Sequence, residues 1–183
     1  MPLLLVTPAA DPLVGRWRTE HDWAARHGIP AHVTIRLPFL PPERWRDPSI
    51  ALLLEGLLPV DVTLSRLEDR PGALVILAEP DDQLRAFTEA VSVQWPELAP
   101  HKGNRPDLAY HVTVVRAEDR AVRAAAADAI APRLPLRVVG SEVWAPRTAS
   151  FTPSLRPRAA TDRTSYFPQR RSARPGSRRG NGG

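Results

Sequence analysis

The sequence contains no cysteine among its 183 residues. Disulfide bonds and all chemistry that needs a thiolate are therefore excluded for this chain. The absence fits a reducing compartment, and we expect a cytoplasmic location.

Long apolar runs are absent as well. No stretch approaches the roughly 20 residues that a membrane-spanning helix needs. The apolar opening at residues 1–6 has no basic segment, is too short for a secretory signal, and is soon followed by Asp11. We expect no membrane segment, and the apolar content of 43% is enough for one domain or two small lobes that share a core.

The charge is divided unevenly along the chain. Residues 153–183 contain eight arginines and one acidic residue, a net charge of +7, whereas residues 1–152 contain 17 basic and 19 acidic residues, a net charge of −2. A segment rich in Arg, Pro, Ser and Gly cannot bury enough apolar surface to offset the entropy of ordering it. We predict a disordered tail over residues 153–183, which either makes nonspecific contacts with RNA phosphates or is simply solvated.

One short pattern occurs twice. Residues 32–35 read His-Val-Thr-Ile, and residues 111–114 read His-Val-Thr-Val. Side chains alternate along a strand, so each copy places His and Thr on one face and two apolar residues on the other. The chain has only five histidines. The matching settings of two of them are therefore a specific signal, although one copy alone would be weak.

The two motifs occupy equivalent places in a repeat of strand, helix, motif strand, helix and strand. The expected elements are residues 3–6, 13–26, 31–37, 47–57 and 60–67 in the first half and 73–77, 81–94, 109–115, 118–131 and 136–144 in the second. Such a repeat predicts an α+β fold over residues 1–152. We expect a bilobal duplicated unit with pseudo-twofold symmetry and intertwined lobes, in which mostly antiparallel sheets line a central cleft. The motif strands would meet at the axis.

Two facing imidazoles suit proton transfer at a phosphate. With a pKa near 6.5, His32 and His111 could serve as the acid and the base of a phosphodiester displacement. The hydroxyls of Thr34 and Thr113 would donate hydrogen bonds to the non-bridging oxygens. The motifs supply no convincing third metal ligand, so we expect neither a metal nor another cofactor.

Two His-x-Thr-x strands in a duplicated α+β unit resemble the two-histidine (2H) phosphoesterase superfamily, and within it the 2′-5′ RNA ligase and cyclic phosphodiesterase family. Residues 28–42, GIPAHVTIRLPFLPP, are similar to the first motif of that family and its trailing Pro-Phe segment. Over about residues 1–150 the resemblance implies a bilobal fold with a central cleft. It also implies RNA-type 2′,3′-cyclic phosphates or 2′-5′ linkages as substrates, with family roles for the His and Thr of both motifs.

Two arginines beside the motifs are further candidates for binding the substrate phosphate. Alternation would place Arg36 on the face of His32 and Thr34, and Arg116 lies just past the second motif, where members of the family often carry a basic residue. Arg36 is either a phosphate contact or a rim charge paired with an acidic neighbour, and Arg116 is either a phosphate contact or an ordinary solvated charge. Arg36 and Tyr110 stand where the family more often has an apolar residue and a proline.

Three classes of function follow from these observations. The first is a monomeric, metal-independent phosphodiesterase or ligase that acts on RNA or nucleotides. The second is a nucleotide- or RNA-binding module that uses the same cleft without turnover, and the third is a structural protein with a basic tail. The sequence leaves open the physiological substrate, the direction of the reaction, and which histidine is the acid.

Overall fold

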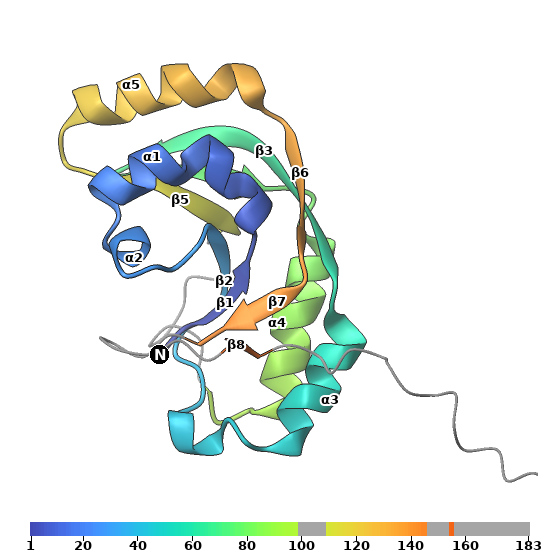
Figure 1. Ribbon diagram of the computed structural model, residues 1–183. Coiled ribbons are helices and arrows are strands. Elements are labelled where there is room, and N and C mark those ends of the chain that lie inside the picture. Colours follow the sequence, from blue (N-terminus) through green and yellow to red (C-terminus); the bar gives the residue numbers. More distant parts are fainter. Residues whose placement is uncertain (99–108, 146–153, 156–183) are drawn as a thin grey trace, which may run out of the picture.

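The structure, a computed structural model, describes residues 1–98, 109–145 and 154–155 (Figure 1). Its first half follows the expected order of strand, helix, strand, helix and strand. The elements are β1 (Leu3–Val6), α1 (Asp11–His21), α2 (Trp23–Arg26), β2 (His32–Arg36), α3 (Pro48–Leu57) and β3 (Val60–Arg70), with short 3-10 turns η1 (Pro8–Ala10) and η2 (Pro42–Arg44).

The second half repeats this order. Its elements are β4 (Ala73–Ala78), α4 (Asp82–Gln94), β5 (His111–Arg116), α5 (Arg120–Ile130), η3 (Ala131–Arg133), β6 (Leu136–Gly140), β7 (Glu142–Trp144) and β8 (Ser154–Leu155). Asp47 and Asp119 cap α3 and α5 at equivalent places, because each side chain accepts from the backbone N–H two residues on, at 2.9 and 2.8 Å.

The eight described strands form one sheet in the order β6-β3-β4-β5-β2-β1-β7-β8, and every pairing is antiparallel. The two motif strands, β2 and β5, are neighbours at its centre. On either side the order is symmetric, since β1 lies beside β2 as β4 lies beside β5. The last strand of each half pairs with the first strand of the other, β3 with β4 and β7 with β1. The predicted α+β fold with a pseudo-twofold axis between the motif strands is confirmed.

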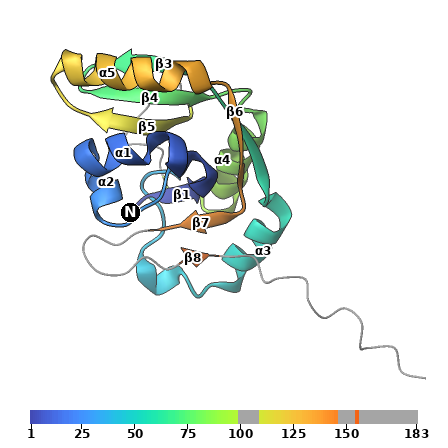
Figure 2. The same ribbon diagram turned by 45° about the horizontal axis from the view of Figure 1, so that its top comes forward.

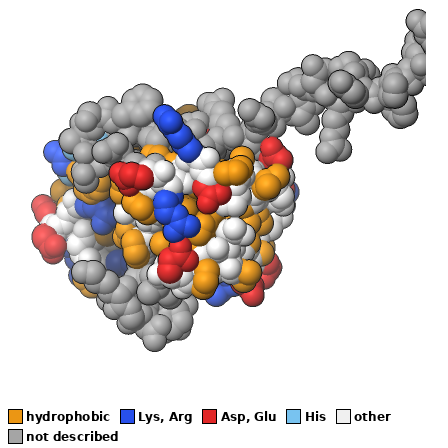
Figure 3. Space-filling model, turned by 90° about the horizontal axis from the view of Figure 1, so that it is seen from below, with side chains coloured by type: hydrophobic (Ala, Val, Ile, Leu, Met, Phe, Trp, Pro, Cys, Tyr) orange, Lys and Arg blue, Asp and Glu red, His pale blue; other side chains and the backbone are white. Residues whose placement is uncertain are grey.

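The helices lie in two pairs against a curled sheet (Figures 1 and 2). One pair is α1 with α5, and the other is α3 with α4. Their apolar faces and the inner face of the sheet form one core, in which Val33, Val112 and Phe87 are completely buried. Among the described helices, none has the length and apolar character needed to cross a bilayer. On the face shown in Figure 3, acidic, basic and apolar side chains are interspersed.

The structure divides two elements that the sequence pattern predicts as continuous. The helix expected over residues 13–26 ends at His21 and restarts at Trp23, because Asp22 has an extended backbone (φ −127°, ψ 116°) and caps α2 by accepting from the N–H of Ala24 at 3.2 Å. The strand expected over residues 136–144 breaks after Gly140, so that β6 pairs with β3 and β7 with β1. A Cβ at Gly140 would lie 2.5 Å from Cγ of Leu5, so the chain crosses the core where only glycine fits.

The sheet also extends into the segment expected to be a tail. Residues 154–155 form β8 and pair with β7, through Leu155 opposite Val143 and Ser154 opposite Trp144. The expected boundary at residue 152 therefore precedes the last described strand. The rest of the predicted tail lies outside the described residues.

Candidate active site

The two motifs lie side by side at the centre of the sheet. Val33 of β2 is directly opposite Val112 of β5 in an antiparallel pairing, and both valines are completely buried. Alternation then places the His and Thr of both motifs together on the other face. In this register each His faces the Thr of the other motif, and the two His residues are diagonal neighbours, with Cα atoms about 7–8 Å apart. The histidines predicted from the sequence are thus brought to one place.

Each motif strand carries one extra residue directly after its Thr. Thr34 lies opposite Leu4 of β1 and Arg36 lies opposite Leu3, so β2 has one more residue than β1 at this point. In the same way, Thr113 lies opposite Val75 of β4 and Val115 lies opposite Leu74. The extra residues are therefore Ile35 and Val114, at equivalent places in the repeat. Such a bulge shifts the alternation of the side chains beyond it.

The bulge changes the expected position of Arg36. Arg36 pairs with Leu3 and lies on the buried face, with an exposed fraction of 5%, and its guanidinium donates to Oγ of Ser92 on α4 at 3.0 Å. Burial lowers the pKa of this guanidinium. The expectation that Arg36 shares the face of His32 and Thr34 is wrong, because simple alternation ignores the bulge. Arg36 therefore lies on the opposite face of the sheet from the two histidines.

The equivalent bulge in β5, at Val114, places Arg116 on the face of the histidines. Arg116 pairs with Ala73, whereas Thr113 and His111 pair with Val75 and Leu77, and these three β4 residues alternate onto one face. More than half of the Arg116 side chain is exposed. It is therefore accessible to a ligand on the face that carries both histidines.

Both histidines are held by the same local hydrogen bond. Nδ1 of His32 lies 2.8 Å from the carbonyl oxygen of Pro30, and Nδ1 of His111 lies 2.9 Å from that of Ala109. A carbonyl oxygen can only accept, so each Nδ1 carries the hydrogen and the neutral ring keeps its lone pair on Nε2. Two Nε2 atoms are thus available, each able to accept a proton or, once protonated, to donate one.

Arg70, at the end of β3, makes a second contact with His111. Its guanidinium lies 3.3 Å from Nδ1 and also pairs with the carboxylate of Glu68. A guanidinium can only donate, so this contact and the bond to Ala109 require opposite tautomers of His111. The shorter bond, repeated at His32, favours hydrogen on Nδ1, and Arg70 then acts on the ring through its charge. Sequence reasoning missed Arg70, which lies between the strands expected over residues 60–67 and 73–77.

The surroundings disfavour the charged form of both rings. Burial, together with the charges of Arg18 and Arg116, lowers the pKa of His32 to about 4, against the opposing effects of the Pro30 carbonyl and the Asp22 carboxylate. Burial also lowers the pKa of His111, with Arg70 and Arg116 adding to the effect. At neutral pH both imidazoles are therefore mostly neutral in the free protein.

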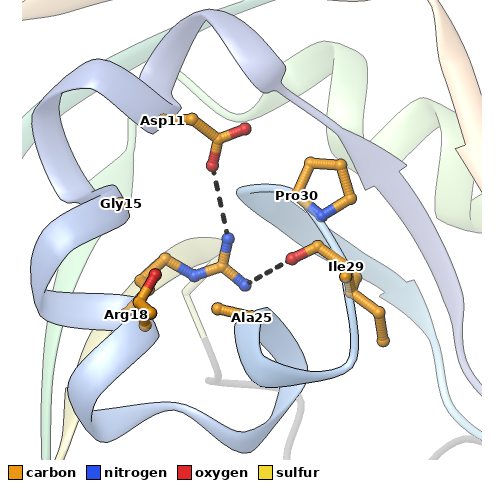
Figure 4. A pocket seen from close by; sticks show the side chains of 8 residues that line it. Asp11, Gly15, Arg18, Ala25, Ile29 and Pro30 are labelled. Carbon is orange, nitrogen blue, oxygen red and sulfur yellow. Dashed lines mark hydrogen bonds and ion pairs between the residues drawn. The ribbon is translucent and has the colours of Figure 1, made fainter.

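A buried carboxylate beside the site connects the two halves. Asp22, 1% exposed, accepts from the guanidinium of Arg18 at 3.2 Å and lies 3.6 Å from Nε of Arg116. Arg18 is equally buried and also contacts Asp11 at 3.5 Å and the carbonyl oxygen of Ile29 at 3.2 Å. Asp11, Arg18 and Ile29 border a cavity of about 330 Å³ (Figure 4). Sequence reasoning also missed Asp22, which it placed in the interior of a helix.

We expect Asp22→Asn to lower the free energy of unfolding by about 3 kcal/mol, because the buried Arg18 guanidinium would lose its nearest carboxylate. Urea denaturation would measure the change. The matched control is Asp11→Asn, which removes the more exposed and more distant partner of Arg18 and should cost clearly less. Equal losses in the two variants would contradict the assignment of Asp22 as the main partner.

The two tryptophans of α1 and α2 have different surroundings. Trp17 packs against the core, whereas Trp23 is half exposed and contacts His27 edge-on. In the part of the chain that the structure describes, no three His, Cys, Asp or Glu side chains gather where they could hold a metal ion.

The fold combines one antiparallel sheet with paired helices, and its two His-x-Thr strands lie on the pseudo-twofold axis. This arrangement defines a two-histidine phosphoesterase fold. The chain belongs to the 2′-5′ RNA ligase superfamily, whose family model matches residues 6–149. The resemblance expected from the motifs is thereby confirmed.

Among solved structures, the crystal structure of Escherichia coli LigT complexed with 3′-AMP is similar to this chain. The match has a TM-score of 0.48 and 13% sequence identity, and it covers 84% of this chain and 94% of that chain. A comparison with curated proteins gave no match.

Proposed function

We propose that this protein is a metal-independent phosphodiesterase or ligase that acts on RNA-type 2′,3′-cyclic phosphates or 2′-5′ linkages by paired-histidine acid–base catalysis. The observation that carries the proposal is the placement of His32 and His111. They are diagonal neighbours on one face, and each has Nδ1 bonded to a backbone carbonyl and Nε2 available.

In hydrolysis of a 2′,3′-cyclic phosphate, the neutral imidazole accepts the proton of the attacking water at Nε2. The new bond forms between the water oxygen and phosphorus, and the bond from phosphorus to one ribose oxygen breaks. That oxygen takes the proton from Nε2 of the second, protonated histidine. In ligation, a ribose hydroxyl takes the place of water.

The charge that the phosphate carries during displacement lies on its non-bridging oxygens. Thr34 and Thr113 stand on the same face as the histidines, one on each side of the pseudo-twofold axis, and their hydroxyls would donate to these oxygens. Arg116 would add a positive charge at the same face. The two histidines supply both proton transfers, so the reaction needs no metal-bound water.

The direct test is turnover of a panel of nucleoside 2′,3′-cyclic phosphates in the presence of EDTA, with the position of the product phosphate determined by NMR. We expect monoester formation that EDTA does not reduce. Saturable binding of the same nucleotides without product would instead favour the binding module, and loss of turnover with EDTA would contradict the metal-independent mechanism.

We further propose that the basic segment after β8 contributes only electrostatic contacts with RNA. Deletion of residues 156–183 should leave kcat and KM for small cyclic nucleotides unchanged, because both motifs lie in the sheet. The affinity for RNA should fall, and its dependence on salt should become weaker, because fewer counterions are released. Loss of small-substrate turnover in the truncated protein would show that this segment belongs to the active fold.

A further inference from the structure

The two sides of the site carry the same catalytic groups but different neighbours. Arg70, Ala73 and Arg116 lie in one row across three adjacent strands, since Arg70 pairs with Ala73 and Ala73 pairs with Arg116. Residues paired across strands share a face, and this is the face of His111 and Thr113. Two arginines therefore flank a small side chain, with Cα atoms about 10 Å apart over two strand spacings.

The turn between β3 and β4 fixes this row. Gly72 has a positive φ of 73°, which allows the tight turn directly after Arg70 and Pro71. Its carbonyl oxygen accepts from the N–H of Ala117 at 3.0 Å, which ties the tip of the turn to the residue after Arg116. Both arginines are thus held at the same level of the sheet.

Each guanidinium is anchored but not enclosed. Arg70 pairs with Glu68 through Nε, and its side chain keeps 21% of its surface exposed. Arg116 pairs with Asp22 at 3.6 Å, and 54% of its side chain is exposed. A guanidinium has more N–H donors than these contacts use, so both side chains retain donors for an anion.

The other side of the pseudo-twofold axis lacks this feature. The offset in sequence that relates His32 to His111 also relates Leu37 to Arg116. Leu37 is apolar and 40% exposed. The acid–base groups are therefore symmetric, whereas the row of Arg70 and Arg116 lies on the side of His111. Arg18, whose charge acts on His32, is buried. A substrate with charge at one end would bind in one orientation.

We propose that Arg70 and Arg116 form a second phosphate-binding site beside the reacting phosphate. This inference rests on the proposed function. The substrate class that it specifies is a nucleotide carrying a further phosphate in addition to the 2′,3′-cyclic one. That group is either a 5′-terminal phosphate or an internucleotide phosphate, and both present the same anionic oxygens to the arginines.

Three substrates with the same reacting group test the proposal. They are adenosine 2′,3′-cyclic phosphate, its 5′-phosphorylated form, and the dinucleotide ApA with a terminal 2′,3′-cyclic phosphate. The wild-type protein should have a kcat/KM about tenfold or more higher for at least one of the latter two, since a charge-assisted contact contributes at about this level. The substrate that is preferred identifies the source of the phosphate.

The variant Arg70→Ala should remove most of this preference, which is the ratio of kcat/KM for the phosphorylated and unphosphorylated substrates, whatever effect the lost charge has on His111. The control is Arg66→Ala, because Arg66 lies on the same strand and also pairs with a carboxylate, that of Glu79 at 3.2 Å. It should leave the preference intact. The preference is a ratio, so a general loss of folded protein cancels from it.

Equal turnover of all three substrates by the wild type, or an equal loss for all three in Arg70→Ala, would overturn the second site. The latter result would mean that Arg70 acts only on His111. Failure of the proposed function would look different, because the wild-type protein would then turn over none of the three.

Discussion

Replacement of either His32 or His111 with alanine should reduce kcat for a 2′,3′-cyclic nucleotide by roughly 100-fold or more. Each variant removes one of the two groups that we propose to move protons, while the Thr hydroxyls and Arg116 remain. The measurement is steady-state hydrolysis by purified protein whose thermal unfolding is compared with that of the wild type.

The double variant should lose little activity beyond either single variant. In the proposed mechanism both histidines act in one displacement, so the rate with one missing already lacks the concerted proton transfer. If the two losses multiplied instead, each histidine would contribute independently, and the paired mechanism would be incorrect.

The matched control is His27→Ala. Nδ1 of His27 lies 2.7 Å from a backbone carbonyl oxygen, that of Trp23, so its local bond resembles those of the two motif histidines. His27 is exposed and lies on the loop after α2 rather than on a motif strand. This variant should keep full activity, and full activity in His32→Ala or His111→Ala would contradict the mechanism.

Periodicity and motif spacing were enough to predict the fold class and the juxtaposition of the motifs. The motif strands have matched patterns in matched surroundings, and a duplicated unit with twofold symmetry brings equivalent elements together at its axis. In the structure Val33 lies opposite Val112, so the central residues of the two His-x-Thr patterns are paired.

Alternation alone could not place the arginines. A period of two assumes a regular strand, whereas the bulges at Ile35 and Val114 insert one residue in each motif strand. The consequence is opposite for the two candidates, since Arg36 is buried against α4 and Arg116 stays with the histidines. Nothing in the local sequence marks these bulges.

Long-range contacts could not be predicted from the sequence pattern either. The helix expected over residues 13–26 contains Asp22, but the side chain of Asp22 caps α2 and pairs with Arg18 and, across the axis, with Arg116. Arg70 reaches His111 only because β3 pairs with β4 of the other half. Such contacts depend on which strands become neighbours, and residue types alone do not specify that.

The second large effect should be seen in the pH dependence of kcat/KM. One histidine must be neutral and the other protonated, so the profile should be bell-shaped, and its limbs belong to the pair rather than to one residue. Burial lowers the pKa of His32 to about 4 and lowers that of His111 below its ordinary value. The optimum of the free protein should therefore lie below pH 6.5. At pH values above the higher of the two pKa values, kcat/KM should fall about tenfold per pH unit.

The profile of kcat should lie at higher pH than that of kcat/KM. An anionic phosphate between the two rings favours their protonated forms, so it raises the pKa of both in the complex. Arg116→Gln should shift the kcat/KM profile in the same direction, because the charge of Arg116 lowers the pKa of both histidines. The control is Arg66→Gln, which changes an arginine that is not among the causes of either pKa shift.

These shifts distinguish the histidine pair from simpler mechanisms. Catalysis by hydroxide would give a rate that rises in proportion to hydroxide over the whole range, and catalysis by one base would give a single limb. A flat profile between pH 5 and 9 would mean that neither imidazole changes its protonation in the reaction. A bell-shaped profile requires two titrating groups. If Arg116→Gln moves the profile to higher pH and Arg66→Gln does not, both groups lie close to Arg116, where the structure places His32 and His111.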